Sequence, residues 1–243
     1  MDTSKLRPDT AALWNVLQDH PLMNGFILIG GTALALRIGH RVSEDLDFAY
    51  VRGNLPGAQL GLLKRRLGQS GIRLEPDVNP ADEELFLNDG LILANYQQNY
   101  LANGSVRLTF VAPENELRTF LQGEPGDALR VATTDEIFAS KSLVCAERSK
   151  SRDWYDLYVL MTRHGYTMGD FHRTFIRIDS PAKFGIASGR LRLCRPLSDD
   201  EGYEQLLDAP PTLDDMRLFF NAQLDALETQ LAKQAFLSVR SEP

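Results

Sequence analysis

The chain has 243 residues, of which 43% are hydrophobic and 24% charged, a composition typical of a globular protein with a substantial core. Its longest apolar run, residues 26–36, is too short to cross a bilayer, and the polar N-terminus lacks the pattern of a secretory signal. Two cysteines, Cys145 and Cys194, exclude a disulfide framework and predict a cytoplasmic protein without a membrane segment.

The charge is unevenly distributed along the chain. The net charge is −7, yet residues 141–195 carry eleven Lys/Arg against five Asp/Glu, a local balance of +6. A basic region beside an acidic remainder is suited to binding triphosphate or RNA. Solvated helix faces explain the same charges, and charge alone favours that simpler interpretation.

The first half of the chain alternates helical and strand patterns. A proline-initiated helix is predicted at residues 8–20, a buried strand at Phe26–Ile29, a short helix at 33–38 and a second strand at 46–51. A leucine-faced helix at 60–67 precedes predicted strands at 72–75, 85–87, 91–100, Val106–Val111 and 129–132. Asn103-Gly104 predicts the hairpin turn between the strands at 91–100 and Val106–Val111.

The second half has helical patterns. Thr133 or Thr134 is the expected cap of a helix at 137–147, and further helices are predicted at 153–162, 169–178 and 213–237. Residues 185–196 have a basic, irregular pattern. We therefore predict an α/β domain over residues 1–132 and a helical domain over 133–243.

One constellation in the first half carries chemistry. Gly30, Gly31 and Thr32 form a turn between a strand and a helix, and Asp45 and Asp47 follow on the next strand. Glycines let backbone N–H groups approach a phosphate, and a helix N-terminus favours negative charge. The two carboxylates point to the same side of their strand, where Mg²⁺, or Mn²⁺ in its place, relieves their repulsion. A tight turn with surface aspartates is the alternative interpretation, and GxGxxG is absent.

Two segments resemble a known family. Residues 30–48 are similar to the signature of DNA polymerase β-type nucleotidyltransferases, and more narrowly to the AbiEii/AbiGii toxin family. Their sequence is GGTALALRIGHRVSEDLDF. Residues 129–160, LRVATTDEIFASKSLVCAERSKSRDWYDLYVL, resemble a later motif of that family. The resemblance implies a mixed-sheet nucleotidyltransferase core followed by a mostly helical C-terminal half.

The resemblance also implies roles for individual residues. It places Asp45 and Asp47 on the metal and makes Lys141 and Asp156 catalytic. It implies nucleotide-binding roles for five residues, with Ser43 the weakest of them: Gly30, Gly31, Thr32, Ser43 and Arg152.

Lys141 suits a phosphate contact on physical grounds as well. Its helix is anchored by apolar neighbours, and an ammonium there neutralises charge that develops on a phosphate. Lys141, Arg148 and Arg152 would share one face if the helix were unbroken. The simpler interpretations are a snorkelling lysine, an exposed Arg152–Asp156 pair and a helix-start cap at Asp153. The aromatic residues of this segment, and Cys145, are predicted to lie in the core.

One position departs from the superfamily pattern. A third carboxylate commonly lies on a later strand beside the aspartate pair, and the side-chain phase of Val106–Val111 places Thr109 there. A hydroxyl cannot serve as a carboxylate base. Three explanations stay open: Glu114 or Glu116 substitutes, the second metal site is weak, or the acceptor is activated otherwise.

Three functions follow from these residues. The first is a Mg²⁺-dependent transfer of NMP from an NTP to an acceptor hydroxyl, with the tRNA 3′ end or other RNA as the implied acceptor. The resemblance makes this enzyme the toxin of a toxin–antitoxin pair, with an antitoxin protein as partner. The second is a catalytically impaired nucleotide-binding or regulatory protein of the same fold. The third is an adenylyltransferase acting on a small molecule or a protein.

Overall fold

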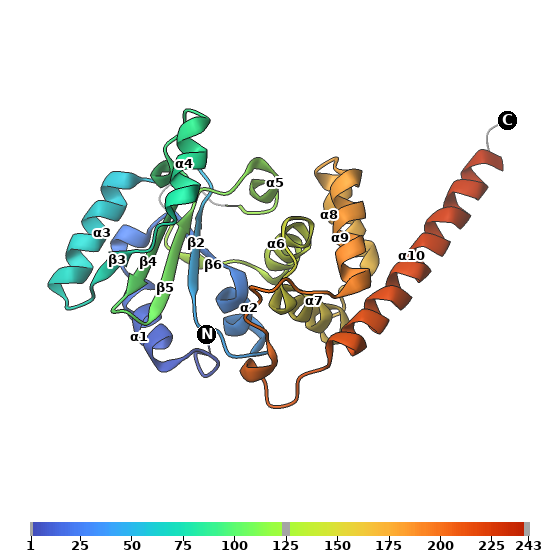
Figure 1. The fold of residues 1–243 in the computed structure, drawn as a ribbon, viewed down its shortest axis with the longest axis horizontal. Coiled ribbons are helices and arrows are strands. Elements are labelled where there is room, and N and C mark those ends of the chain that lie inside the picture. Colours follow the sequence, from blue (N-terminus) through green and yellow to red (C-terminus); the bar gives the residue numbers. More distant parts are fainter. Residues whose placement is uncertain (1, 123–126, 241–243) are drawn as a thin grey trace. The chain divides into compact units, whose positions relative to one another are not determined.

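The computed structural model describes residues 2–122 and 127–240, which form two compact units, Met1–Ile137 and Phe138–Pro243. The first contains a sheet with helices around it, and the second contains helices (Figure 1). This is the mixed-sheet core followed by a helical half that the sequence predicts. Within the described residues, no helix is long and apolar enough to cross a membrane.

The first unit is built on a six-stranded mixed sheet with the order β3-β4-β5-β2-β1-β6. β2 pairs with β5 and β1 with β6 in parallel, and the other neighbours are antiparallel. The strands are β1 (Phe26–Ile29), β2 (Leu46–Tyr50), β3 (Leu74–Pro76), β4 (Gln97–Ala102), β5 (Val106–Val111) and β6 (Arg130–Val131).

Side-chain alternation gives the central strands a buried face and a more open face. Phe110 lies on the buried face, with its ring 5.3 Å from that of Phe26 and 5.6 Å from that of Phe48. The residues between the buried ones, Asp47 on β2 and Thr109 on β5, are half-buried. Because alternate residues of a strand point to opposite faces, these polar residues share the open face.

Helices of the first unit are α1 (Pro8–Leu17), α2 (Gly30–Ile38), α3 (Gly57–Gln69), α4 (Pro80–Asn88) and α5 (Asn115–Arg118), with 3₁₀ turns at Pro21–Met23 and Leu93–Asn95. The strand predicted at 85–87 is wrong, because these residues belong to α4. Asn79 caps this helix by accepting a hydrogen bond from the Ala81 N–H, and Pro80 starts it. The strand predicted at 91–100 begins only at Gln97, after the second 3₁₀ turn.

The predicted hairpin is confirmed. β4 and β5 pair through six residues each and are joined by three residues, Asn103, Gly104 and Ser105. Asn103 and Gly104 have positive φ, 48° and 71°, as the two central positions of a type I′ turn require.

Helix α6 (Thr134–Glu147) begins with a reciprocal cap. Thr133 Oγ1 accepts a hydrogen bond from the Glu136 N–H, and Glu136 accepts one from the Thr133 N–H. Arg130 donates two hydrogen bonds of 2.7 Å to the same carboxylate. The threonine cap that the sequence predicts is therefore Thr133.

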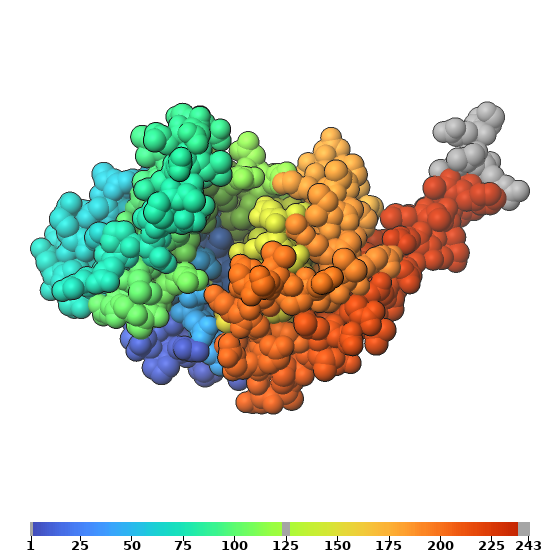
Figure 2. Space-filling model, viewed as in Figure 1, coloured from blue at the N-terminus to red at the C-terminus, as the bar shows by residue number. Residues whose placement is uncertain are grey.

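The second unit continues with α7 (Ser151–Arg163), α8 (Met168–Arg177), α9 (Pro181–Leu193) and α10 (Leu213–Arg240), with a 3₁₀ turn at Glu204–Leu206. The irregular stretch predicted at 185–196 is wrong, since most of it is α9, started by Pro181 and ended by Cys194 in the left-handed conformation. The start of α10 buries Met216 and Phe220, whereas its last turns extend away from the unit's other helices (Figure 2).

The aromatic residues of α7 belong mainly to the core of this unit. Trp154 is fully buried, and Tyr155 stacks on Tyr203 with 5.5 Å between ring centroids. Cys145 is buried as well, as predicted. The shared helix face predicted for Lys141, Arg148 and Arg152 is wrong, because the chain leaves helix α6 at Glu147 and starts α7 at Ser151.

Candidate functional site

The glycine turn connects β1 directly to α2. Helix α2 starts at Gly30, three residues before its predicted start. Gly30 has φ +74°, and a Cβ there would lie 2.7 Å from Asp47 Oδ2. A Cβ on Gly31 would collide with the guanidinium of Arg41. Both positions therefore require glycine, because the chain passes directly against charged side chains of the following loop and strand.

The N-terminus of α2 offers its backbone N–H groups. Its N-cap residue is Ile29, which makes no side-chain hydrogen bond to the first turn. The first N–H groups of a helix have no partner within the helix, and the helix dipole makes this end attractive to anions. The start of α2 at Gly30 and Gly31 is thus suited to a phosphate group.

Thr32 and Ser43 tie this helix to the loop before β2. Thr32 is 2% exposed, its Oγ1 lies 2.8 Å from Ser43 Oγ, and it also donates to the carbonyl oxygen of Asp45. The backbone N–H of Ser43 donates a hydrogen bond to the carbonyl oxygen of Lys5. The two hydroxyls, predicted to contact phosphate, have partners within the protein and hold the loop that carries the aspartates.

Asp45 and Asp47 flank Leu46 at the start of β2. Both are half-buried, and the intervening Leu46 is fully buried on the other face. Asp45 immediately precedes β2, which begins at Leu46 as predicted and ends at Tyr50, one residue before its predicted end. Asp47 is paired in register with Ile29 of β1 and with Thr109 of β5.

The register confirms that Thr109 lies beside Asp47. Within the described residues, no three or more His, Cys, Asp or Glu side chains form a group that could hold a metal, so neither Glu114 nor Glu116 completes such a group. The carboxylates of Asp45 and Asp47 are nevertheless the hard oxygen ligands that Mg²⁺ prefers. The pair fits a divalent cation whose remaining ligands come from water or substrate phosphates.

Arg41 belongs to this region as well, although no sequence motif singles it out as a site residue. It is 4% exposed, packs against Gly31 and donates to the Val42 carbonyl oxygen over 3.1 Å. A buried guanidinium raises the positive potential at the glycine turn. Only its contact with Gly31, ten residues earlier in the chain, reveals this role, and no local pattern predicts it.

Lys141 lies in a buried charge cluster of the second unit. It is 5% exposed, and its Nζ lies 2.7 Å from Asp153 Oδ1 and 2.7 Å from Asp156 Oδ2. Arg148 adds a 2.8 Å bond from Nε to Asp153 Oδ2. The snorkelling lysine and the helix-start cap at Asp153 are therefore both wrong, because these side chains pair with one another inside the unit.

Arg152 contacts a different segment. Its Nε donates to the Gly202 carbonyl oxygen over 2.8 Å, and its Nη1 lies 3.1 Å from Glu201 Oε2. Asp156 is fully buried. The exposed position expected for an Arg152–Asp156 pair is thus wrong, because the two side chains are 17% and 0% exposed, and the nucleotide contact of Arg152 stays a prediction.

The charge cluster makes stability depend on pH. Burial by itself would raise the pKa of Asp153, but Lys141 and Arg148 outweigh burial and hold that pKa below its ordinary value. A carboxylate whose pKa is lowered by folding stabilises the fold above its unfolded-state pKa of about 4. This contribution is lost as the pH falls through the lower folded-state pKa.

We therefore expect the free energy of unfolding of the wild type to fall below about pH 4. Asp153→Asn removes this titration, so its stability should fall less steeply over the same range. Urea denaturation across that range measures both slopes. Equal slopes in the two proteins would contradict the assigned pKa shift.

The cysteines have no reactive character. Burial raises the pKa of Cys145, and it raises that of Cys194 to about 12. A thiol is nucleophilic only as the thiolate, so both are protonated and inert near neutral pH.

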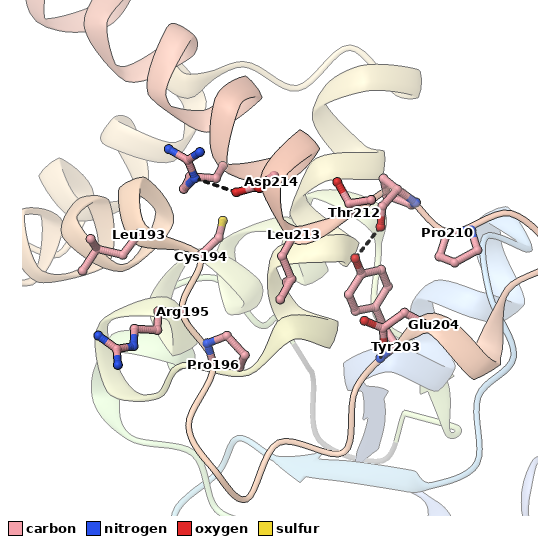
Figure 3. A pocket seen from close by; sticks show the side chains of 12 residues that line it. Leu193, Cys194, Arg195, Pro196, Tyr203, Glu204, Pro210, Thr212, Leu213 and Asp214 are labelled. Atoms are coloured by element: carbon pink, nitrogen blue, oxygen red, sulfur yellow. Dashed lines mark hydrogen bonds and ion pairs between the residues drawn. The ribbon is translucent and has the colours of Figure 1, made fainter.

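A pocket lies within the helical unit, between the end of α9 and the start of α10 (Figure 3). Its volume is about 680 Å³, and leucine and proline side chains make up much of its wall. Tyr203 donates to the Pro211 carbonyl oxygen, and Arg217 pairs with Asp214 over 3.0 Å. These bonds hold the connection into α10, and the pocket contains none of the residues that the sequence motifs single out.

Gly30→Ala tests the glycine turn. An L-residue at φ +74° costs roughly 1–2 kcal/mol, and the new methyl group would displace the Asp47 carboxylate. We expect a lower melting temperature together with loss of Mg²⁺-dependent nucleotide binding, measured by calorimetry. Gly68→Ala is the matched control, because a Cβ at this helical glycine meets open space. Unchanged binding in Gly30→Ala would contradict this geometry.

The family model described as "Nucleotidyl transferase AbiEii toxin, Type IV TA system" matches residues 11–239. Among curated proteins, the chain is 28% identical over 152 residues to the uncharacterized protein aq_aa25 of Aquifex aeolicus (strain VF5). That match covers 63% of this chain and 65% of the length of the relative.

Two crystal structures from Helicobacter pylori are similar to the chain. JHP933 has a TM-score of 0.51 and 18% identity, covering 96% of this chain and 97% of its own. A proposed nucleotidyltransferase has a TM-score of 0.50 and 20% identity, covering 92% and 95%. At these identities the likeness shows a shared fold.

Proposed function

Because the chain belongs to the nucleotidyl transferase AbiEii toxin family, we propose that it transfers a nucleoside monophosphate from an NTP to an acceptor hydroxyl. The observation that carries this proposal is the adjacency of two features in the first unit. Asp45 and Asp47 lie at the start of β2, and the Asp47 carboxylate reaches the glycine turn that starts α2. One feature suits a divalent cation and the other a phosphate.

Asp45 and Asp47 would hold Mg²⁺. When bound, the cation polarises phosphoryl oxygens and offsets their charge. The backbone N–H groups of Gly30 and Gly31 bind and orient the phosphates, with Thr32 and Ser43 fixing the loop that carries the carboxylates. The buried Arg41 adds positive potential at the same turn.

The reaction balances as a displacement at phosphorus. The acceptor hydroxyl oxygen bonds to the α-phosphorus, the bond from the α-phosphorus to the bridging oxygen breaks, and pyrophosphate leaves with that oxygen. The hydroxyl proton passes to water or to a carboxylate of the aspartate pair, since the Thr109 hydroxyl is no base.

Lys141 and Asp156 are proposed as catalytic residues, and Arg152 as a nucleotide contact, from the resemblance of their segment. The charge cluster supports an oriented ammonium at Lys141, because two carboxylates fix its Nζ. An ammonium held in this way needs no reorganisation when charge develops on a phosphate.

RNA is the proposed acceptor, with the tRNA 3′ end as the first choice. The basic balance of residues 141–195 supports a polyanionic acceptor. The family's toxin–antitoxin description supports an antitoxin protein as partner.

The experiment is incubation of the protein with each α-labelled NTP, Mg²⁺ and total RNA, followed by detection of labelled RNA. We expect label in RNA with the wild type and none with Asp45→Ala/Asp47→Ala. If the wild type labels RNA no more than this variant, RNA is excluded as acceptor. Parallel assays with protein and small-molecule hydroxyl acceptors test the adenylyltransferase alternative.

A nucleotide-binding protein without turnover is the second candidate. It is favoured by Thr109, which occupies the position beside Asp47 where a third carboxylate is expected. Calorimetry showing tight Mg²⁺–NTP binding, with no pyrophosphate released over any acceptor, would support this candidate over the enzyme.

A further inference from the structure

The open face of the sheet continues beyond the aspartate pair. Thr109 is paired in register with Asp47 on one side and with Asn99 of β4 on the other. Residues directly opposite one another on neighbouring strands point to the same face. Gln97, two residues before Asn99, points the same way and donates from Nε2 to Asn99 Oδ1 over 3.1 Å. We call Gln97, Asn99 and Thr109 the amide ledge.

The ledge is accessible and has unused hydrogen-bonding capacity. Thr109 and Asn99 are half-buried, and Gln97 is exposed. Among the described residues, the Thr109 hydroxyl has no hydrogen-bond partner, and the Asn99 side chain bonds only Gln97. Half-buried polar groups of this kind are stabilised when water or a ligand supplies the missing bonds.

The position of the ledge fits the part of a nucleotide that lies beyond its phosphates. Neighbouring strands are about 4.8 Å apart, so Asn99, two strands from Asp47, lies about 10 Å from it across the sheet. β4 and β5 lie side by side in Figure 1. A nucleotide whose phosphates lie at the glycine turn beside Asp47 can therefore reach the ledge with its sugar or its base.

The charges near the ledge exclude a second phosphate. Gln97 and Asn99 also line a cavity of about 200 Å³, whose wall includes Asp82 and Glu83 of α4. Carboxylates repel a phosphate, whereas neutral amides pair with groups that both donate and accept. Pockets for drug-sized ligands measure about 300–1,000 Å³, so this smaller cavity suits a single ring.

We propose that the amide ledge binds the nucleoside part of a nucleotide, a sugar hydroxyl or a base edge, while the phosphates of that nucleotide lie at the glycine turn beside Asp45 and Asp47. This inference rests on the proposed function and names the residues that determine its specificity. The nucleoside belongs either to the NTP or to the terminal nucleotide of the acceptor.

Asn99→Ala tests the ledge, because its backbone pairing in β4 is left intact while the amide is removed. Asn88→Ala is the matched control, since Asn88 is an exposed amide at the end of α4. Calorimetry measures the binding of each Mg²⁺–NTP and of Mg²⁺–tripolyphosphate, which has no nucleoside. Transfer assays measure the KM for acceptor RNA.

If the NTP supplies the nucleoside, Asn99→Ala weakens binding of the preferred NTP about three- to tenfold, the loss expected for one hydrogen bond. Tripolyphosphate binding is then unchanged. If the acceptor supplies it, NTP binding is unchanged and the KM for RNA rises by a similar factor. Equal behaviour of Asn99→Ala and Asn88→Ala in both measurements would overturn the inference.

The same measurements separate this inference from the proposed function. A wild type that binds NTP without any transfer overturns the enzyme, and the calorimetric comparison still decides the role of Asn99. A wild type that neither binds nor transfers nucleotide overturns both.

Discussion

Asp47→Asn is expected to lower nucleotide transfer roughly 10³-fold, the scale of losing one preorganised electrostatic contact to a reacting phosphate. The substitution keeps the shape of the side chain but removes its charge, and an amide is a much poorer ligand for Mg²⁺ than a carboxylate. Asp45→Asn should have a similar effect, because Asp45 is proposed as the second carboxylate ligand of the same cation. No third carboxylate joins the pair among residues 2–122 and 127–240, so each of the two carries a larger share of the metal's binding free energy.

Initial rates of pyrophosphate release, measured over a range of Mg²⁺ concentrations, check this expectation. Asp208→Asn, a change of the same kind at an exposed position, is the control and should keep the wild-type rate. Circular dichroism establishes that each variant is folded. An Asp47→Asn protein that keeps more than about a tenth of the wild-type rate would contradict the metal-binding role.

Lys141→Met is expected to destabilise the protein by about 3–5 kcal/mol. The change removes an ammonium that lies 2.7 Å from both Asp153 and Asp156, and their carboxylates are 3% and 0% exposed. Taking away one partner of a buried ion pair leaves the other charge desolvated, which costs more than the pair itself contributes. Arg148 still neutralises Asp153, so Asp156 should account for most of the loss.

The double variant Lys141→Met/Asp156→Asn separates structure from catalysis. Neutralising Asp156 should recover part of the lost stability, because a buried amide costs less than a buried charge. Nucleotide transfer should stay absent if Lys141 contacts a phosphate. Urea denaturation and transfer assays on the same samples give both values. Because Asp156 is proposed as catalytic too, a stable double variant with wild-type transfer would show that both Lys141 and Asp156 serve the fold alone.

The structure corrects the sequence-based prediction mainly where short apolar runs are ambiguous. Leu85-Phe86-Leu87 has the length of a strand, and its periodicity cannot distinguish a strand from one face of a helix. The capping residues Asn79 and Pro80 decide in favour of α4. Residues 185–196 were predicted to be irregular because they contain glycines and several arginines, but most of them belong to α9.

Local sequence determined much of the candidate site. The bounds of β1 and β5 and the Asn103-Gly104 turn follow from patterns within a few residues. Backbone dihedrals and strand alternation act over such short distances, so the chain's own order is enough to predict them.

Contacts between distant residues were decided by the tertiary structure. Arg41 packs on Gly31, and the Thr32 hydroxyl is hydrogen-bonded to that of Ser43. The strand register continues from Asp47 through Thr109 to Asn99. Each of these contacts joins separate elements. The partners of Lys141 likewise come from the next helix. Such pairings depend on how strands align and helices pack, which the free energy of the whole fold determines and no local pattern records.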